Sequence, residues 1–188
     1  MFNKFVKMVF DKTIETIDKL IAIDEDVKKL DADYRADLIT AKTMNKKKDD
    51  LRNEIPAIQF EYNEEITNIR NLFETALKKY EMIDGSKVHE DAKIFDYDIT
   101  LTAEQLQELV NKHHDNAFML QLIEKYCMDH RNIFIVMPLT GKARRDKFTQ
   151  FINDANYCVF SPYSLKKSFF EAGQYTPDLD SDFPVETE

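Results

Sequence analysis

The sequence predicts a mainly α-helical protein, with a long antiparallel helical hairpin (coiled-coil-like) at the N-terminus and a small helical C-terminal domain with at most two short strands. Two observations lead to this fold class. Residues 10–83 contain no glycine and one proline, Pro56, and their apolar residues recur every three or four positions, as on one face of a helix. The whole chain of 188 residues has only 3 glycines and 5 prolines, which suits a protein with few tight turns.

An apolar seam runs through this long stretch. Its spacing is close to the 3.5-residue repeat of a coiled coil, and mostly charged or amide side chains fill the positions between. The first part of the seam consists of Leu20, Ile23, Val27, Leu30, Tyr34, Leu38, Ala41, Met44, Lys48, Leu51, Ile55 and Ile58. The second part consists of Ile58, Tyr62, Ile66, Ile69, Phe73, Leu77, Tyr80 and Ile83. The pattern predicts two long helices, over about residues 11–53 and 55–83.

Pro56 is the strongest break between these two helices. Proline lacks a backbone N–H and disfavours a helical conformation in the residue before it, so the first helix is expected to end at Ile55. Either the chain turns near Pro56 and forms a hairpin, or Pro56 kinks a single rod whose seam needs another chain. We favour the hairpin, because a short connection usually makes antiparallel neighbours. The second helix is expected to end at Gly85.

Shorter elements are expected after residue 86. Residues 102–105, Thr-Ala-Glu-Gln, match a capping box that starts one helix, and Asp115 or Asn116 is able to cap the next. Residues 133–137 are β-prone and have residues 157–160 as their one obvious strand partner, although both are also compatible with buried connectors. Further helices are expected over residues 142–153 and from Ser161 to Gly173.

These elements divide the chain into three parts. Residues 1–85 form a hairpin or coiled-coil arm, residues 86–173 a small helical domain, and residues 174–188 an acidic flexible tail. The tail contains proline and several carboxylates, so it is expected to be disordered or to act as a strap that orders on binding.

Charge is unevenly distributed along the chain. The formal net charge is −9, yet residues 131–170 contain seven basic and two acidic side chains, while residues 171–188 contain six acidic and no basic ones. Basic side chains on two expected helices form the candidate partner-binding surface: Lys142, Arg144, Arg145, Lys147, Lys166 and Lys167. Nucleic acid, an acidic protein partner or the chain's own tail would suit this surface. The net charge argues against a general nucleic-acid binder, because attraction to phosphates dominates such binding.

The sequence carries no recognisable catalytic or cofactor motif. A dinucleotide fingerprint, a nucleophile elbow and an HExxH pattern are all absent, so we expect no enzyme and no cofactor. Cys127 and His130 share a helical face, and His113 and His114 precede them, but a structural zinc site normally has four ligands at tighter spacing. A buried cysteine and surface histidines are therefore expected, with no metal. Two cysteines, no secretory signal and no transmembrane segment favour a reducing cytoplasm.

Residues 95–126 combine a Leu-Thr-Ala start at 101–103, a Leu-x-x-Leu pattern at 106–109 and an Asp-Asn break at 115–116 before Met119 and Leu120. This segment, about 32 of the 188 residues, resembles a stretch of small uncharacterised helical proteins of tailed phages that infect low-GC Gram-positive bacteria. The resemblance implies a phage gene product of the scaffolding or virion type, located in the host cytoplasm or in the virion. Scaffolds often join a coiled coil to a basic helical end, whereas here an acidic tail follows the basic residues.

The leading functional hypothesis is a non-enzymatic interaction or assembly protein. Its long arm would serve self-association into a homo-oligomer, and its basic face would bind a virion or host protein. One alternative is an acidic inhibitor that blocks the nucleic-acid-binding site of a host protein. The other is a nucleic-acid binder that acts through the C-terminal basic residues.

Overall fold

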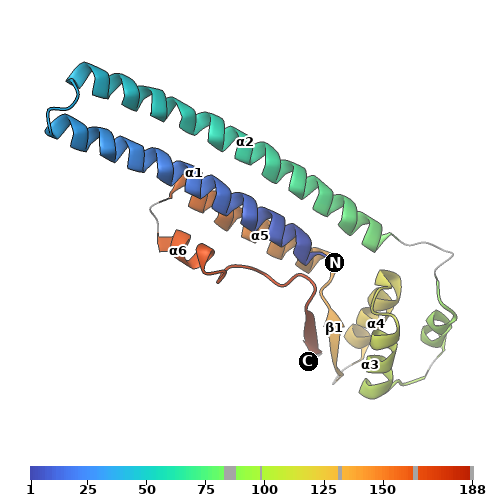
Figure 1. Ribbon diagram of the computed structural model, residues 1–188. Coiled ribbons are helices and arrows are strands. Elements are labelled where there is room, and N and C mark those ends of the chain that lie inside the picture. The colour runs from blue at the N-terminus through green and yellow to red at the C-terminus, as the bar shows by residue number, and fades with distance from the viewer. Residues whose placement is uncertain (83–87, 98, 131–132, 163–164, 187–188) are drawn as a thin grey trace. The chain divides into compact units, whose positions relative to one another are not determined.

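The computed structural model describes residues 1–82, 88–97, 99–130, 133–162 and 165–186. The chain is mainly helical, and its two long N-terminal helices pack together as a hairpin, which confirms the predicted fold class (Figure 1). The elements are α1 (Asn3–Arg35), α2 (Ala41–Glu81), the 3₁₀ helix η2 (Glu90–Asp96), α3 (Ala103–Lys112), α4 (Ala117–Asp129), β1 (Phe134–Pro138), α5 (Gly141–Phe160), α6 (Leu165–Glu171) and β2 (Asp182–Glu186). The expected helix end at Gly85 lies outside the described residues.

The described residues form two compact units. The first contains residues 1–72 and 147–177, and the second contains residues 73–146 together with the segment from residue 178 onward. Both α2 and α5 contribute to each unit, so the units do not follow the predicted division of the chain at residues 85 and 173.

The hairpin turns at residues 36–40, so the predicted turn at Pro56 was wrong. Asp37 has a positive φ of 55°. The N–H of Asp37 donates to the carbonyl oxygen of Tyr34 at 3.1 Å, and the N–H of Leu38 donates to that of Asp33 at 2.9 Å. This is the Schellman pattern, in which one left-handed residue ends a helix and the next N–H groups satisfy its last carbonyls. Aspartate takes the left-handed conformation more readily than most residues, so the turn needs no glycine.

Helix α2 begins directly after this turn and runs through Pro56. Thr40 caps its start, because the N–H of Thr43 donates to the Thr40 hydroxyl at 3.3 Å. The side chain of Pro56 is exposed, whereas the nearby seam residues Ile55 and Ile58 are half-buried. The packing of the continuous apolar seam therefore stabilises α2 by more than the loss of one backbone hydrogen bond at Pro56 destabilises it.

Ion pairs between α1 and α2 reflect their antiparallel alignment. Near the start of α1, Lys12 Nζ lies 3.0 Å from Glu61 Oε1 of α2. Closer to the turn, Lys48 of α2 pairs with Asp31 of α1. As the α1 residue number rises, the α2 partner number falls, as an antiparallel pair requires.

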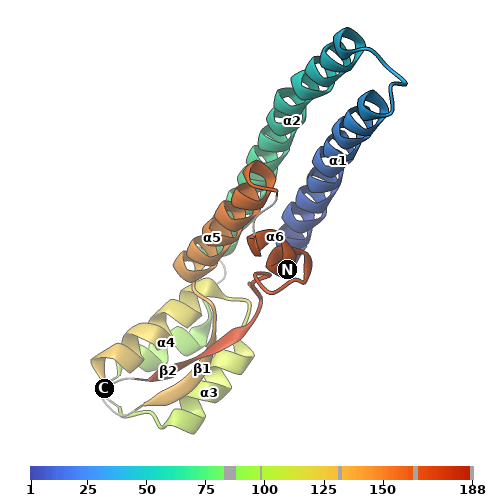
Figure 2. The same cartoon turned by 90° about the vertical axis from the view of Figure 1, so that its left-hand side faces the viewer.

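Helices α1 and α2 together with residues 147–160 of α5 build the core of the first unit, and α6 lies beside them (Figure 2). Phe170 of α6 stacks on Phe10 of α1 and on Phe151 of α5, with ring centroids 5.3 and 5.4 Å apart. The buried apolar side chains of this core include Phe5, Val6, Val9, Ile17, Leu20, Ile23, Tyr62, Ile66, Ile69, Phe148, Phe151, Ile152, Ala155, Cys158, Val159 and Phe170.

In the second unit, α3 packs against the two-stranded antiparallel sheet, α4 packs on α3, and η2 packs on α4. Strand β1 pairs with β2, with Ile135 opposite Val185. The predicted strand partner, residues 157–160, was wrong, because these residues continue α5. The tail was expected to be disordered or to act as a strap that orders on binding; in the structure, residues 182–186 form β2. The unit's core consists of Leu101, Leu106, Val110, Leu120, Ile123, Cys127, Ile133, Ile135 and Met137.

Two glutamines of α3 form hydrogen bonds outside the helix ladder: Gln105 at the start of α3, and Gln107 with strand β1. The predicted capping box is confirmed, since Thr102 accepts from the Gln105 N–H at 3.3 Å and the Gln105 side chain accepts from the Thr102 N–H at 3.0 Å. Gln107 then bonds both backbone groups of Val136: its Oε1 accepts from the N–H at 2.8 Å, and its Nε2 donates to the carbonyl at 3.0 Å. One amide side chain thus pairs with β1 as a neighbouring strand would.

Candidate functional site

The six basic residues predicted to bind a partner are divided between the two units. Lys142, Arg144 and Arg145 belong to the second unit. The other three, Lys147, Lys166 and Lys167, belong to the first. Their contacts within each unit indicate what each of them does in the fold.

Arg144 is a structural residue of the second unit. Only 4% of it is exposed, and its Nε donates to the carbonyl oxygen of Leu179 at 2.9 Å. Its guanidinium lies 4.6 Å from the ring centroid of Tyr80, which is cation–π distance. Arg144 therefore joins the segment after residue 178 to α2 and α5 within this unit.

Arg145 is held by two carboxylates of α2. Its Nε lies 3.1 and 3.2 Å from the two oxygens of Glu74, and its Nη2 lies 3.5 Å from Glu81 Oε2. Gly141, one turn earlier on α5, gives Glu81 its space, because a Cβ there would overlap the Glu81 carboxylate. The charge of Arg145 is thus largely compensated inside its own unit.

In the first unit, two of the three basic residues form local ion pairs. Lys166 Nζ lies 2.9 Å from Asp154 Oδ1, and Lys167 Nζ lies 3.5 Å from Glu171 Oε1. Lys142 and Lys147 are exposed. Partner binding by the six residues stays a prediction. The exposed Lys142 and Lys147 are better candidates for it than Arg144 and Arg145, which already have contacts within their unit.

The end of the hairpin is the least covered part of the apolar seam. We call residues 24–58 the distal hairpin; the structure describes all of them, and Leu30 is the only buried side chain among them. The other seam residues there are half-buried or exposed: Val27, Met44, Leu51, Ile55 and Ile58 are half-buried, and Tyr34 and Leu38 are exposed. A coiled-coil seam is normally desolvated, so this one is incomplete within a single hairpin.

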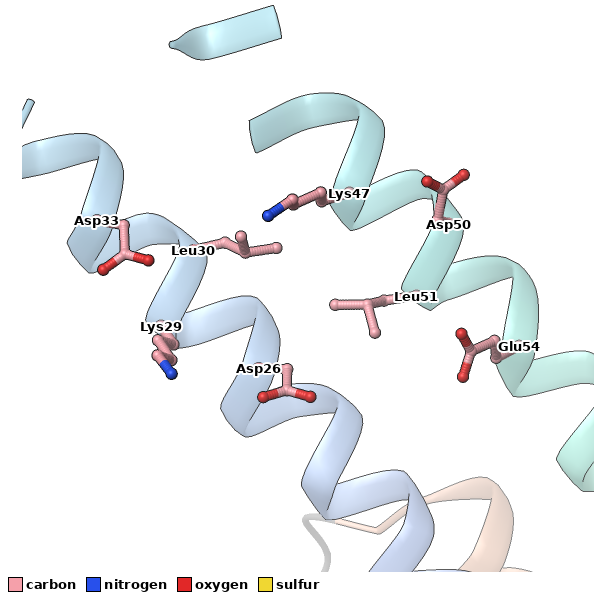
Figure 3. Close-up of a pocket in the computed structure, with 8 residues that line it drawn as sticks. All are labelled: Asp26, Lys29, Leu30, Asp33, Lys47, Asp50, Leu51 and Glu54. Atoms are coloured by element: carbon pink, nitrogen blue, oxygen red, sulfur yellow. The ribbon is translucent and has the colours of Figure 1, made fainter. Parts of the chain in front are cut away.

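A groove of about 400 Å³ lies between the two helices of the distal hairpin. Figure 3 shows Leu30 of α1 and Leu51 of α2 directed into the space between the helices, with charged side chains around them. The groove is lined by Asp26, Lys29, Leu30, Asp33, Lys47, Asp50, Leu51 and Glu54. We call this the hairpin groove. Its floor is apolar and its rim carries both signs of charge.

A second cavity, of about 330 Å³, marks where α5 stops covering the hairpin. It is lined by Leu20, Ile23, Asp24 and Val27 of α1, by Arg52, Ile55 and Gln59 of α2, and by Val159 and Pro162 at the end of α5. On one side of it α5 runs alongside the hairpin, and on the other side the distal hairpin extends as two helices alone (Figure 1). The seam therefore loses its third helix at this point.

The histidines and cysteines are arranged differently from the grouping considered in the sequence. Cys127 is buried, and burial raises its thiol pKa to about 11. The ring of His130 stacks on Tyr126 at 3.9 Å. His113 lies instead beside His89 and Asp91, a combination that the sequence reasoning missed, although the His-x-Asp pattern at residues 89–91 is visible in the sequence.

No protein-family model, curated protein or solved structure matches this chain. Across the described residues, no helix is both long and apolar enough to cross a membrane.

Proposed function

We propose that this chain is a non-enzymatic assembly protein that associates with copies of itself through the distal hairpin. The observation that carries the proposal is the half-buried seam from Val27 to Ile58, with Leu30 its only buried member. One neighbouring helix covers only part of the apolar stripe of an amphipathic helix, whose width is about 100° or more. Where α5 lies alongside, the stripe is covered; beyond α5, a second hairpin would supply the missing surface.

The charges of the distal hairpin favour a second copy as the partner. Residues 24–58 contain nine acidic and eight basic side chains, a net charge of −1, whereas the whole chain carries −9. Two copies therefore meet at this end with little net repulsion, and side chains of opposite sign are available on both. An elongated apolar seam with mixed charge on its flanks is also the pattern of self-associating coiled coils.

Two hairpins would pack as an antiparallel four-helix arrangement, with Leu30 and Leu51 of each copy at the centre. The same patch would contact itself across a two-fold axis, which closes the assembly as a dimer. The resemblance of residues 95–126 to proteins of tailed phages makes a virion or its scaffold the setting that we propose for this assembly.

The test is the solution mass by light scattering over a range of protein concentrations. We expect the mass to rise with concentration from one chain of 22.2 kDa toward that of two chains. Leu51→Glu, which places a charge on the seam, should return the protein to a monomer. The matched control is Met128→Glu, an exposed methionine outside the distal hairpin, which should leave the mass unchanged.

Two results would contradict the proposal. A strict monomer over the whole concentration range would mean that the hairpin does not associate with its copy. A dimer that persists in Leu51→Glu, with circular dichroism showing an intact fold, would place the interface elsewhere.

A further inference from the structure

Three metal-ligating side chains of the second unit come together at one place. His89 immediately precedes η2, Asp91 lies in its first turn, and His113 follows the last residue of α3. One ligand atom from each of the three lies within 4.8 Å of the other two. We call these residues the His–Asp cluster.

We propose that the His–Asp cluster binds a divalent transition-metal ion of the zinc type. Two imidazoles and one carboxylate are the donor set of zinc sites that have three protein ligands and a further position open to water or another ligand. The same set accepts other first-row metals, since imidazole suits zinc, copper, iron and nickel.

The distances are close to those of a coordinated ion. His113 Nε2 lies 2.8 Å and His89 Nδ1 lies 3.2 Å from Asp91 Oδ2. Ligand atoms about 2.1 Å from a tetrahedral ion lie roughly 3.4 Å from one another. Side-chain movements of about an ångström are therefore enough to admit the ion. The exposure of the three residues rises from His113, which is buried, to His89, which is exposed, so the ion has a path from solvent.

Contacts to Asp91 hold the two histidines in place. His113 Nε2 and Lys112 Nζ lie 2.8 and 2.7 Å from Asp91 Oδ2, so this carboxylate oxygen faces the position that the ion would take. His89 Nδ1 accepts a hydrogen bond from the Asp91 N–H at 3.2 Å, and the ion would replace this N–H as the partner of that nitrogen. His113 reaches Asp91 from α3, so an ion would join α3 to η2 within the second unit.

Lys112 is the natural competitor of the ion. Its Nζ lies 2.7 Å from Asp91 Oδ2, the oxygen that also faces both histidines, and its side chain is 56% exposed. Without metal, the ammonium neutralises the carboxylate. Binding would replace this ammonium at Asp91 Oδ2 with the ion.

The experiment is a titration of tag-free protein with ZnCl₂ by isothermal calorimetry, with the absorption spectrum of the Co²⁺-loaded protein as a second readout. We expect one ion per chain. His89→Ala and Asp91→Asn, which leave buried His113 in place, should each weaken Zn²⁺ binding more than about tenfold. His114→Ala is the matched control, because His114 is the next residue and its imidazole is exposed; it should bind as the unchanged protein does.

The variant Lys112→Met distinguishes a metal site from a network of ion pairs that only stabilises the fold. Loss of the competing ammonium should tighten Zn²⁺ binding severalfold, whereas a purely structural network gives no binding to tighten. The proposal is overturned if the unchanged protein binds no stoichiometric Zn²⁺, or if His89→Ala, Asp91→Asn and His114→Ala all bind alike.

Discussion

Replacement of Pro56 by alanine should stabilise the hairpin. Pro56 lies in the interior of α2, on the exposed side of the helix. It cannot donate the hydrogen bond that its position would give to the carbonyl of Arg52, and its ring crowds that carbonyl. Alanine restores the bond and removes the crowding. Because the proline side chain is exposed, the substitution loses no core packing.

The expected gain is about 2–3 kcal/mol in the free energy of unfolding. Relative to alanine, a proline in a helix interior costs about 3 kcal/mol, a difference that includes its effect on the unfolded chain.

The assay is urea unfolding followed by circular dichroism at 222 nm. The midpoint for Pro56→Ala should rise with an unchanged slope, which marks a change in stability alone. Ala57→Gly is the control, because Ala57 is the next exposed residue of α2 and glycine in a helix interior costs about 1 kcal/mol. If Pro56→Ala gives no gain and Ala57→Gly no loss, the chain leaves the helix near Pro56 and our placement of the turn is refuted.

Three further predictions concern the turn, a buried arginine and a buried tyrosine. Asp37→Gly should stabilise the hairpin by about 0.5–1 kcal/mol in the same assay, because glycine takes a positive φ without strain; a loss would argue against a left-handed residue there. Arg144→Ala should cost about 2 kcal/mol or more, since it removes a charged hydrogen bond to Leu179, while exposed Lys142→Ala should be nearly neutral; equal effects would contradict the structural role. Burial raises the pKa of Tyr62 from 10.0 to about 12, so the unfolded chain loses this proton first. The unchanged protein should therefore lose stability relative to Tyr62→Phe above pH 10, by about 1.4 kcal/mol at about pH 11 and by no more than about 2.7 kcal/mol well above pH 12. A difference in urea midpoint between the two proteins that is the same at about pH 9 and about pH 11 would refute this.

The helical architecture was predictable because its signals are local. Apolar residues at three- and four-residue spacing define the inner face of a helix, and the capping box at Thr102 needs only the next three residues. The position of the turn was not predictable in this way. The strongest local breaker, Pro56, is tolerated within α2, whereas Asp37, which carries no obvious turn signature beside it, takes the left-handed position.

The remaining differences involve partners far apart in the sequence. Residues 134–138 pair with 182–186, and no local pattern marked the acidic tail as a strand. Arg144 and Arg145 were candidate surface residues by charge count, but Tyr80 and Glu74 on α2 compensate them. The His–Asp cluster likewise joins residues from two separate helices, so its formation depends on tertiary packing.

The most direct test of self-association through the distal hairpin is amide hydrogen–deuterium exchange at a low and a high protein concentration. The measurement reports which segment becomes protected as chains associate, which solution mass alone does not show. We predict that protection increases with concentration in residues 24–58, while α3, α4 and β1 exchange at the same rates at both concentrations. Association accompanied by protection in another segment, with residues 24–58 unchanged, would contradict the account.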